Sequence, residues 1–529
     1  MKKIIIILST LLIAPLLFLS QQSPVNNVNG FTADPGSFEI LNRFQGRSNV
    51  LKVENSKTQW DNARYSLAQY RGKTIAIEFS VDVWLEGSTN MLMWNVSDHP
   101  NYPRVSMLSS STSGQWNNMR GRIIVTPTQS NAVLSLNKWG HPANTIFYIA
   151  NPTVTITEGI NYSPALSLPS LKEVYANNFL IGNNIDWDGR YNSGKHFDLL
   201  NHHFNIVSTT ASTVPNSLAP LEKGGAYRFS EADNIVNHFI KNNMQIYAQV
   251  LIWHMEPHPA WFYEGTREEI IQNMNDYIAT VMRHFRGRIN TWEVVNEAVR
   301  DGLTARDVRG DWRNCLFDSQ HRPNVYSPRN IWFEKLGSDY IELAFRAARA
   351  ADPNIKLYYN DNNLEDANKV EVVRKMIQDI NDRYKRETGG TRNLIEGVGT
   401  QTHIWNLNQN INNVRNALDK LTSLGIEISV TELDIPGDFI GIQRYGYDTD
   451  MSERDAINQG LLYARLMQLF KEYSAHITRV TFWGLDDNTS WISNGNPNLF
   501  DWKLNAKPAF HAVSDPDGFI RQHGGRTRR

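Results

Sequence analysis

Two glutamates in this chain stand where a buried strand is expected to end. Residues 291–298 have the sequence Thr-Trp-Glu-Val-Val-Asn-Glu-Ala, whose Trp and Val residues favour a strand that ends at Asn296 and Glu297. Residues 426–436 have the same form and place Glu432 at the end of an apolar run. A carboxylate in such a place is costly unless chemistry uses it. Two strand-end glutamates on one barrel rim are what cleavage of a glycosidic bond requires.

The elements that would hold these glutamates alternate between strands and helices. Residues 339–349 are the clearest helix, with Ile341, Phe345 and Ala348 on one face. Eight alternating units predict a (β/α)8 TIM barrel, an α/β fold, over residues 171–520, and the longest insertion, 302–329, would lie at the mouth of the site. The eight predicted strands are 179–182, 204–208, 245–253, 290–297, 355–360, 397–403, 426–432 and 477–484.

The carboxyl ends of these strands are unusually polar or aromatic, and chemistry in such a barrel lies at that rim. One polar group there is readily explained as structural, but a whole ring of them is hard to explain by packing. The strand ends in question are Trp253-His254, Asn296-Glu297, Asn360-Asp361, Gln401-Thr402-His403, Thr431-Glu432 and Trp483-Gly484.

The part that precedes the barrel has a different pattern. Residues 28–158 contain short alternating strands separated by Gly, Pro, Ser and Asn turns, which predicts an all-β jelly-roll sandwich. Residues 159–170 are rich in Pro and Ser and are expected to be a linker. The module resembles the jelly-roll carbohydrate-binding modules often attached to xylanases. Trp rings are good platforms for sugars but are as readily core residues, and the candidates are Trp84, Trp94, Trp116 and Trp139.

Residues 175–515 resemble the family 10 glycoside hydrolases, best known as endo-β-1,4-xylanases. The resemblance implies a retaining double displacement with Glu297 as the general acid/base and Glu432 as the nucleophile. The matching motifs, in chain order, are Trp-Glu-Val-Val-Asn-Glu-Ala (292–298), Tyr-Tyr-Asn-Asp (358–361), Gly-Val-Gly-Thr-Gln-Thr-His (397–403), Val-Thr-Glu-Leu-Asp (430–434), Val-Thr-Phe-Trp-Gly (480–484) and Lys-Pro-Ala-Phe (507–510).

The same resemblance implies a set of substrate-binding residues. His403 would hydrogen-bond near Glu432 and steady its ionised form, while Asn296 would reach the sugar 2-hydroxyl and Gln401 would orient the same region. The sugar that reacts would be enclosed by Trp253, Trp483 and Trp491. Gln249 corresponds to the family's His before the third-strand tryptophan, and we include it in the binding set.

Three departures from the family fall around this site. After the second strand the family usually carries a Glu-Asn-x-Met-Lys segment that grips the sugars on the non-reducing side, but residues 208–215 here are Ser-Thr-Thr-Ala-Ser-Thr-Val-Pro. The family's His is Gln249, and the aromatic residue after the fifth-strand Asn-Asp is Asn362. We therefore expect the catalytic residues to be intact and the binding site for the non-reducing-side sugars to differ from that of the family. Such a site would suit a decorated or non-standard β-xylan or a related β-glycan.

Composition limits the partners and the compartment. The formal net charge is −1, so nothing indicates nucleic acid or an anionic membrane as a partner. Residues 1–20, with Lys2-Lys3 before an apolar run, predict a signal peptide and a secreted protein, extracellular or periplasmic. The single cysteine, Cys315, is interpreted as a buried apolar residue. We expect a monomer that acts on a polysaccharide, with no metal or cofactor, no membrane contact after signal removal, and a solvated tail at 521–529.

Three functions remain open. The leading one is a secreted endo-β-1,4-xylanase of the retaining type with an appended glycan-binding module. The second is a retaining hydrolase of another or decorated β-glycan, which a substrate panel would distinguish. The third is a barrel that binds glycan without cutting it; the lost grip segment favours it, and the two glutamates with Asn296 and His403 disfavour it.

Overall fold

The computed structural model describes most of the chain, with gaps at both ends and in several connections. The predicted signal peptide at 1–20 lies outside the described residues. The described ranges are 27–33, 38–55, 63–86, 91–97, 104–108, 114–139, 145–159, 163–185, 191–192, 194–210, 212–255, 258–318, 329–437, 450–488, 490–492 and 495–525.

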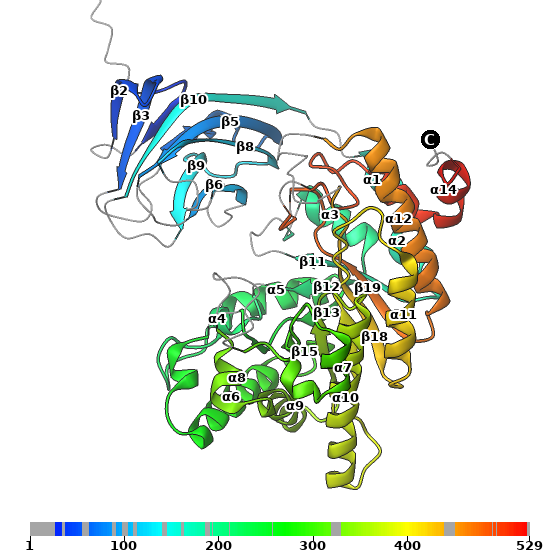
Figure 1. Ribbon diagram of the computed structural model, residues 1–529. Helices are drawn as coiled ribbons and strands as arrows, with labels where there is room; N and C mark the ends of the chain where they lie inside the picture. The colour runs from blue at the N-terminus through cyan, green and yellow to red at the C-terminus, as the bar shows by residue number, and fades with distance from the viewer. Residues whose placement is uncertain are drawn as a thin grey trace, which may run out of the picture.

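The N-terminal part is a β-sandwich (Figure 1), as the strand pattern predicted. Within the described ranges it forms two five-stranded antiparallel sheets, in the orders β1-β4-β9-β6-β7 and β2-β3-β10-β5-β8. Its elements are β1 (Phe31–Ala33), β2 (Phe38–Phe44), β3 (Arg47–Asn55), β4 (Ala63–Ser66), the 3₁₀ helix η1 (Ala68–Tyr70), β5 (Ile75–Leu85), β6 (Met91–Ser97), β7 (Arg104–Leu108), β8 (Trp116–Val125), β9 (Val133–Trp139) and β10 (Thr145–Glu158).

The core of the sandwich settles one of the tryptophan candidates. Trp94 is fully buried, with its ring edge-on to Phe31 and 4.9 Å from Phe79, so it cannot be an exposed platform. Trp84 and Trp116 lie opposite each other on β5 and β8, on the outer face, and are partly exposed. Period-two alternation in a strand does not by itself say which face meets the core, and for Trp94 the inward face is the correct one.

The sandwich is joined to the barrel by a short, specific contact. Arg122 of β8 is buried, pairs with Asp450 at 2.8 Å and lies 4.9 Å above the ring of Trp502. Its carbonyl also accepts a hydrogen bond from the amide of Asn488. Ala76 and Ile124 belong to the same buried apolar cluster as the barrel. The module is therefore packed on the barrel as well as linked to it through the segment that holds α1 (Ser163–Leu166).

The C-terminal part is the predicted parallel barrel. Its strand order is β13-β12-β11-β19-β18-β17-β16-β15-β14, and pairing of β13 with β15 closes the ring. The third strand of the barrel is interrupted and forms β13 and β14, so the nine strands occupy eight positions around the barrel. The strands are β11 (Leu180–Ile185), β12 (Ile206–Thr209), β13 (Gln245–Ala248), β14 (Ile252–Trp253), β15 (Thr291–Asn296), β16 (Lys356–Asp361), β17 (Gly397–Thr400), β18 (Glu427–Leu433) and β19 (Ile477–Phe482).

Helices lie outside the barrel strands (Figure 1). The predicted helix at 339–349 is α9, with Ile341, Phe345 and Ala348 buried. The last helix, α14, continues to His523, beyond position 520. The helices not yet named are α2 (Leu171–Val174), α3 (Gly194–His203), α4 (Pro215–Leu218), α5 (Ser230–Lys241), η3 (Ala260–Tyr263), α6 (Arg267–His284), α7 (Ala305–Arg309), η4 (Trp312–Cys315), α8 (Ile331–Leu336), α9 (Asp339–Ala351), α10 (Ala367–Thr388), α11 (Ile411–Thr422), α12 (Glu453–Glu472), α13 (Pro508–Ser514) and α14 (Pro516–His523).

Among the helices of the described ranges, none is both long enough and apolar enough to cross a membrane. Cys315 is buried in η4, as expected for an apolar role.

Candidate active site

Four consecutive strands of the barrel, β15 to β18, bring the two glutamates to the same rim. Asn296 at the end of β15 lies opposite Asn360 of β16, and Asp361 lies opposite Thr400 of β17, which pairs with Val430 of β18. Glu297 follows with a left-handed backbone (φ 51°), held by its N–H, which donates to the Asn360 carbonyl at 2.9 Å. That unusual turn for a non-glycine residue is the kind of local strain that gathers at functional sites.

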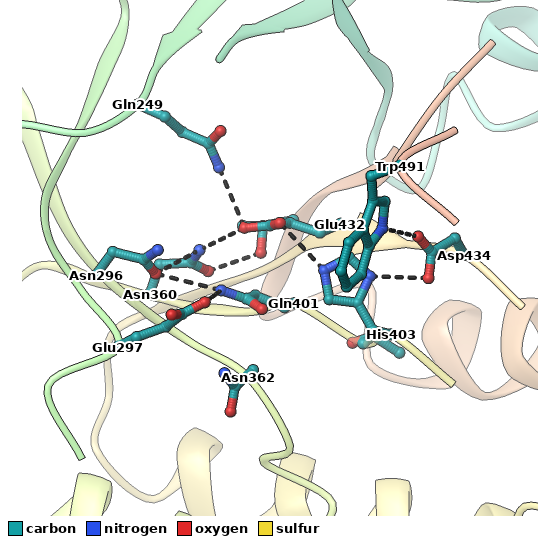
Figure 2. Close-up of polar contacts among 12 residues, drawn as sticks. Gln249, Asn296, Glu297, Asn360, Asn362, Gln401, His403, Glu432, Asp434 and Trp491 are labelled. Atoms are coloured by element: carbon teal, nitrogen blue, oxygen red, sulfur yellow. Dashed lines mark hydrogen bonds and ion pairs between the residues drawn. The ribbon is translucent and has the colours of Figure 1, made fainter. Parts of the chain in front are cut away.

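A chain of side-chain amides connects the two carboxyl groups (Figure 2). Gln401 Nε2 donates to Glu297 Oε1 at 2.7 Å and to Asn296 Oδ1 at 3.3 Å. Asn360 Nδ2 donates to the same Asn296 oxygen at 3.2 Å and to Glu432 Oε1 at 2.8 Å. Because both donors use the oxygen of Asn296, its amide nitrogen is left to point away from this chain of contacts.

Glu297 sits in surroundings that favour its protonated form. Burial raises the pKa of Glu297 to about 6, with Glu432 and Asp361 adding to the rise and Gln401 and Lys369 opposing it. Trp253 Nε1 donates to Glu297 Oε2 at 3.0 Å and fixes the carboxyl group. A carboxyl that holds its proton near neutral pH can act as a general acid.

Glu432 lies beside His403, which is itself paired with Asp434. It is buried, and its Oε2 lies 3.2 Å from His403 Nε2, while His403 Nδ1 lies 2.8 Å from Asp434 Oδ1. Burial acts to lower the pKa of His403, but Asp434 and Glu432 outweigh it and raise that pKa to about 10. His403 is therefore an imidazolium between two carboxylates, and its charge stabilises Glu432.

A second buried acid lies behind Glu432. Gln249 Nε2 lies 3.3 Å from Glu432 Oε1 and 3.2 Å from Oε2 of Glu293, and Tyr247 Oη donates to the latter oxygen at 2.6 Å. Burial, followed by the charge of Glu432, raises the pKa of Glu293 well above its usual range. Two carboxyl oxygens on one side of the Gln249 amide require its nitrogen to face them, so its own oxygen faces away.

Aromatic rings border the same space. Trp491, which is 56% exposed, has its ring 5.1 Å from His403 and 5.4 Å from Trp405. Its Nε1 donates to Asp434 Oδ2 at 2.8 Å, so the ring is held in place while one face stays open. Trp483 is mostly buried and lies edge-on to His403 at 6.2 Å. An open, immobilised indole face is suited to packing against a sugar ring.

All nine predicted site residues come together, and their roles stay predictions. The sequence reasoning did not select Asn360, Asp434 or Glu293, which contact the predicted residues directly. A usable signal existed: Asp434 stands two residues after Glu432, directly past the end of β18, and Asn360 lies near the end of β16, one of the two strands between β15 and β18. The nine residues are Gln249, Trp253, Asn296, Glu297, Gln401, His403, Glu432, Trp483 and Trp491.

The segment after β12, which lacks the sugar-binding motif of the family, is hydrogen-bonded to the barrel. Thr213 Oγ1 lies within hydrogen-bond distance of two carbonyls, that of Thr209 at 2.8 Å and that of Gln249 at 2.5 Å. Thr213, Thr209 and Ser212 are all buried. In the described part of the segment the side chains thus support the wall of the cleft, and no charged side chain reaches into it from there.

No group of three or more His, Cys, Asp or Glu side chains within the described ranges is arranged to hold a metal ion.

Comparison with known proteins gives a consistent result. The family model "Glycosyl hydrolase family 10" matches residues 170–516. Endo-1,4-beta-xylanase A of Thermoanaerobacterium saccharolyticum is 32% identical over 495 residues, covering 89% of this chain and 39% of the relative. Exoglucanase XynX of Acetivibrio thermocellus is 33% identical over 387 residues, covering 70% and 31% respectively. This chain thus spans between about a third and two fifths of the length of these two relatives.

Solved structures agree with the sequence matches. A bacterial Ig-like domain containing GH10 xylanase from termite gut is 30% identical, with a TM-score of 0.60, and the match covers 82% of this chain and 94% of that one. An intracellular xylanase of T. saccharolyticum, solved as a mutant with xylotetraose, is 33% identical with a TM-score of 0.55, and the match covers 66% and 98%.

Proposed function

Because this chain belongs to glycosyl hydrolase family 10, we propose that it cleaves internal β-1,4-xylosidic bonds of xylan by a retaining double displacement. The observation that carries the proposal is the pair of rim glutamates joined through Asn296, one in surroundings that keep its proton and one beside an imidazolium. Such a division between two carboxyl groups is the requirement for this reaction.

In the first step Glu432 attacks the anomeric carbon. The bond from that carbon to the bridging oxygen breaks, and Glu297 gives its proton to the departing oxygen. In the second step Glu297, now ionised, takes a proton from water, and the water oxygen displaces Glu432 from the same carbon. The product keeps the starting configuration, and Glu297 ends protonated as it began. Asn296 donates its free amide hydrogens to the 2-hydroxyl of the reacting sugar.

Xylan is favoured as the substrate because relatives from several genera are named xylanases, and an intracellular xylanase of similar structure was solved, as a mutant, with xylotetraose. The loss of charged side chains after β12 supports a preference for decorated xylan over plain linear chains. A β-glucan is the second candidate, because one relative is named an exoglucanase. A polysaccharide panel with product analysis separates these substrates.

The N-terminal sandwich and the destination of the protein complete the proposal. A glycan-binding role for the sandwich is supported by its resemblance to jelly-roll modules and by the partly exposed Trp84 and Trp116. Secretion is supported by the pattern of residues 1–20, although a relative of similar structure is described as intracellular. We expect the protein to act as a monomer. Affinity electrophoresis on xylan tests the glycan-binding role of the sandwich, and size-exclusion chromatography tests the monomeric state.

The test of the reaction uses Glu297→Ala and Glu432→Ala, with Glu453→Ala, an exposed position at the start of α12, as the matched control. Wild type and Glu453→Ala should release reducing ends from xylan, and the two site variants should not. With an activated aryl xyloside and azide, Glu432→Ala should form the α-azide and Glu297→Ala the β-azide. Exchange of the two azide products would reverse the roles, and full activity of either variant would end the proposal.

A further inference from the structure

One end of strand β8 in the sandwich is covered by the barrel. Met119 and Ile123 belong to the core of the sandwich, so the alternating side chains of Arg122 and Ile124 point to the outer face of the sheet. Earlier in the strand that outer face is open, as at Arg120, yet Arg122 and Ile124 are both buried. Ile124 is part of the apolar cluster of the barrel, so it is the barrel that covers this end of the sheet.

The barrel residues that Arg122 contacts lie at the catalytic face of the barrel. Asn488, whose amide donates to the Arg122 carbonyl, follows β19. Asp450, which pairs with the guanidinium at 2.8 Å, lies just before α12. Segments that run from a strand to the next helix lie at the carboxyl rim of a parallel barrel, where the two glutamates also lie. The sandwich therefore reaches the rim itself, beside the loop that carries Trp491.

Asn488 lies within the loop that presents Trp491 to the site. On one side of Asn488, Asp487 pairs with the buried Lys507 at 3.0 Å. On the other side, Trp491 donates to Asp434 at 2.8 Å and keeps one face of its indole open. The hydrogen bond to the sandwich therefore acts on the stretch between these two anchors, three residues before the exposed indole.

The side chain of Arg122 acts on the same loop as its carbonyl. The buried guanidinium lies 4.9 Å above the ring of Trp502, besides its pair with Asp450. The segment of Trp502 also holds Phe500, whose carbonyl accepts a hydrogen bond from the N–H of Asp487 at 3.1 Å. Separation of the sandwich from the rim would leave a buried cation without its partners, so the seated arrangement is favoured.

We propose that Arg122 is a positioning residue for Trp491, through which the seated sandwich fixes the loop after β19 and so completes the sugar site of the barrel. The inference rests on the proposed function, because it is measured through hydrolysis of xylo-oligosaccharides. It gives the sandwich a part in the cleavage of short soluble substrates, separate from any binding of polymer at its own face.

The test is a double-mutant cycle between Arg122 and Trp491 in the full chain. Wild type, Arg122→Ala, Trp491→Ala and the double variant are assayed on linear xylohexaose, well below the unfolding temperature of each. Arg122→Ala should lower kcat/KM about tenfold, mainly by raising KM, because it loosens the ring that packs on the sugar. In the Trp491→Ala background the same change should lower kcat/KM less than about twofold, since the residue through which it acts is gone.

The control is Arg71→Ala, which removes an exposed arginine whose Nε donates to the Thr128 carbonyl within the sandwich. This variant should stay within about twofold of wild type in both backgrounds. A control that lowers kcat/KM as much as Arg122→Ala would show that the loss does not depend on the contact with the rim, and the inference would then be wrong.

Asn488→Ala breaks the hydrogen bond and leaves the buried arginine paired, so it tests the same link with less disturbance of folding. It should lower kcat/KM about fivefold, again with little further effect once Trp491 is alanine. The inference fails if Arg122→Ala and Asn488→Ala stay within about twofold of wild type, or if their losses are as large in the Trp491→Ala background, as general destabilisation would produce. If wild type does not cut xylohexaose, the proposed function fails, and the inference with it.

Discussion

Substitution of Asp434 by Asn gives the sharpest test of the electrostatics at the nucleophile. Asp434 is fully buried, faces His403 Nδ1 at 2.8 Å and accepts a hydrogen bond from Trp491 at 2.8 Å. The variant keeps the size of the side chain and removes its charge. We expect the pKa of His403 to fall from about 10 toward its ordinary value, so that the imidazolium beside Glu432 is lost within the working pH range.

The size of the effect follows from linkage. A rise of the His403 pKa from 6.5 to about 10 corresponds to roughly 5 kcal/mol at 1.36 kcal/mol per pKa unit. Asp434 is the stronger of its two partners, so the variant should lose about 2–3 kcal/mol of unfolding free energy at pH 6. Below pH 6.5 both folded and unfolded His403 carry the proton and the stabilisation is complete. From pH 6.5 to about 10 only the folded protein holds the proton, so the difference between wild type and variant should shrink with rising pH.

The assay is urea unfolding at several pH values together with NMR titration of the His403 ring. Asp382→Asn removes the same charge from a partly exposed position on α10, where Asp382 pairs with Lys385 at 3.3 Å, and serves as the control. The reasoning is refuted if Asp434→Asn leaves the His403 titration near pH 10, or if its stability loss is the same at pH 6 and pH 9.

Three further predictions follow from the geometry. Glu297→Gln should lower kcat/KM on xylan about 10²–10⁴-fold but much less on an aryl xyloside with a good leaving group, and the alkaline decline of activity set by the pKa of about 6 should vanish from the pH–rate profile. Glu293→Gln should raise KM and lower kcat together through Gln249 while the product keeps its anomeric configuration, which steady-state kinetics and NMR of the product would check. Trp94→Ala should destabilise the sandwich by about 3–5 kcal/mol in thermal unfolding and leave hydrolysis of soluble xylo-oligosaccharides unchanged.

The barrel and the positions of both glutamates could be predicted because the hydrophobic periodicity of the segments, and the place of each glutamate at the end of a strand, are visible in the sequence. A run such as Trp-Glu-Val-Val-Asn-Glu has the residues of a buried strand, and its end must fall on the rim of a parallel barrel. The side-chain contacts between barrel strands could not be predicted in the same way. That Asn360 bonds Glu432, or that Trp491 bonds Asp434 from a distant loop, depends on register and on side-chain rotamers that no local pattern specifies.

The break in the third strand of the barrel shows the same limit of prediction from the sequence. The sequence of residues 245–253 predicts one strand, yet β13 ends at Ala248 and β14 begins at Ile252. The interruption is stabilised by the N–H of Leu251, which donates to the Glu293 carbonyl at 3.1 Å. It also sets Gln249 where its amide meets both Glu293 and Glu432. Hydrophobicity alone shows that this segment is buried but does not show where its backbone leaves the regular ladder.

The buried pair of Lys369 and Asp361 acts on the catalytic acid. Lys369 Nζ lies 3.0 Å from Asp361 Oδ1, and both residues act on the pKa of Glu297, Asp361 raising it and Lys369 lowering it. Asp361 also accepts a hydrogen bond from Tyr359, whose hydroxyl in turn accepts one from the N–H of Ala298 next to the acid. Removal of Lys369 would leave the buried Asp361 carboxylate without its cation and disturb the acid. The pKa of Glu297 therefore depends on this buried ion pair as well as on burial of its own carboxyl group.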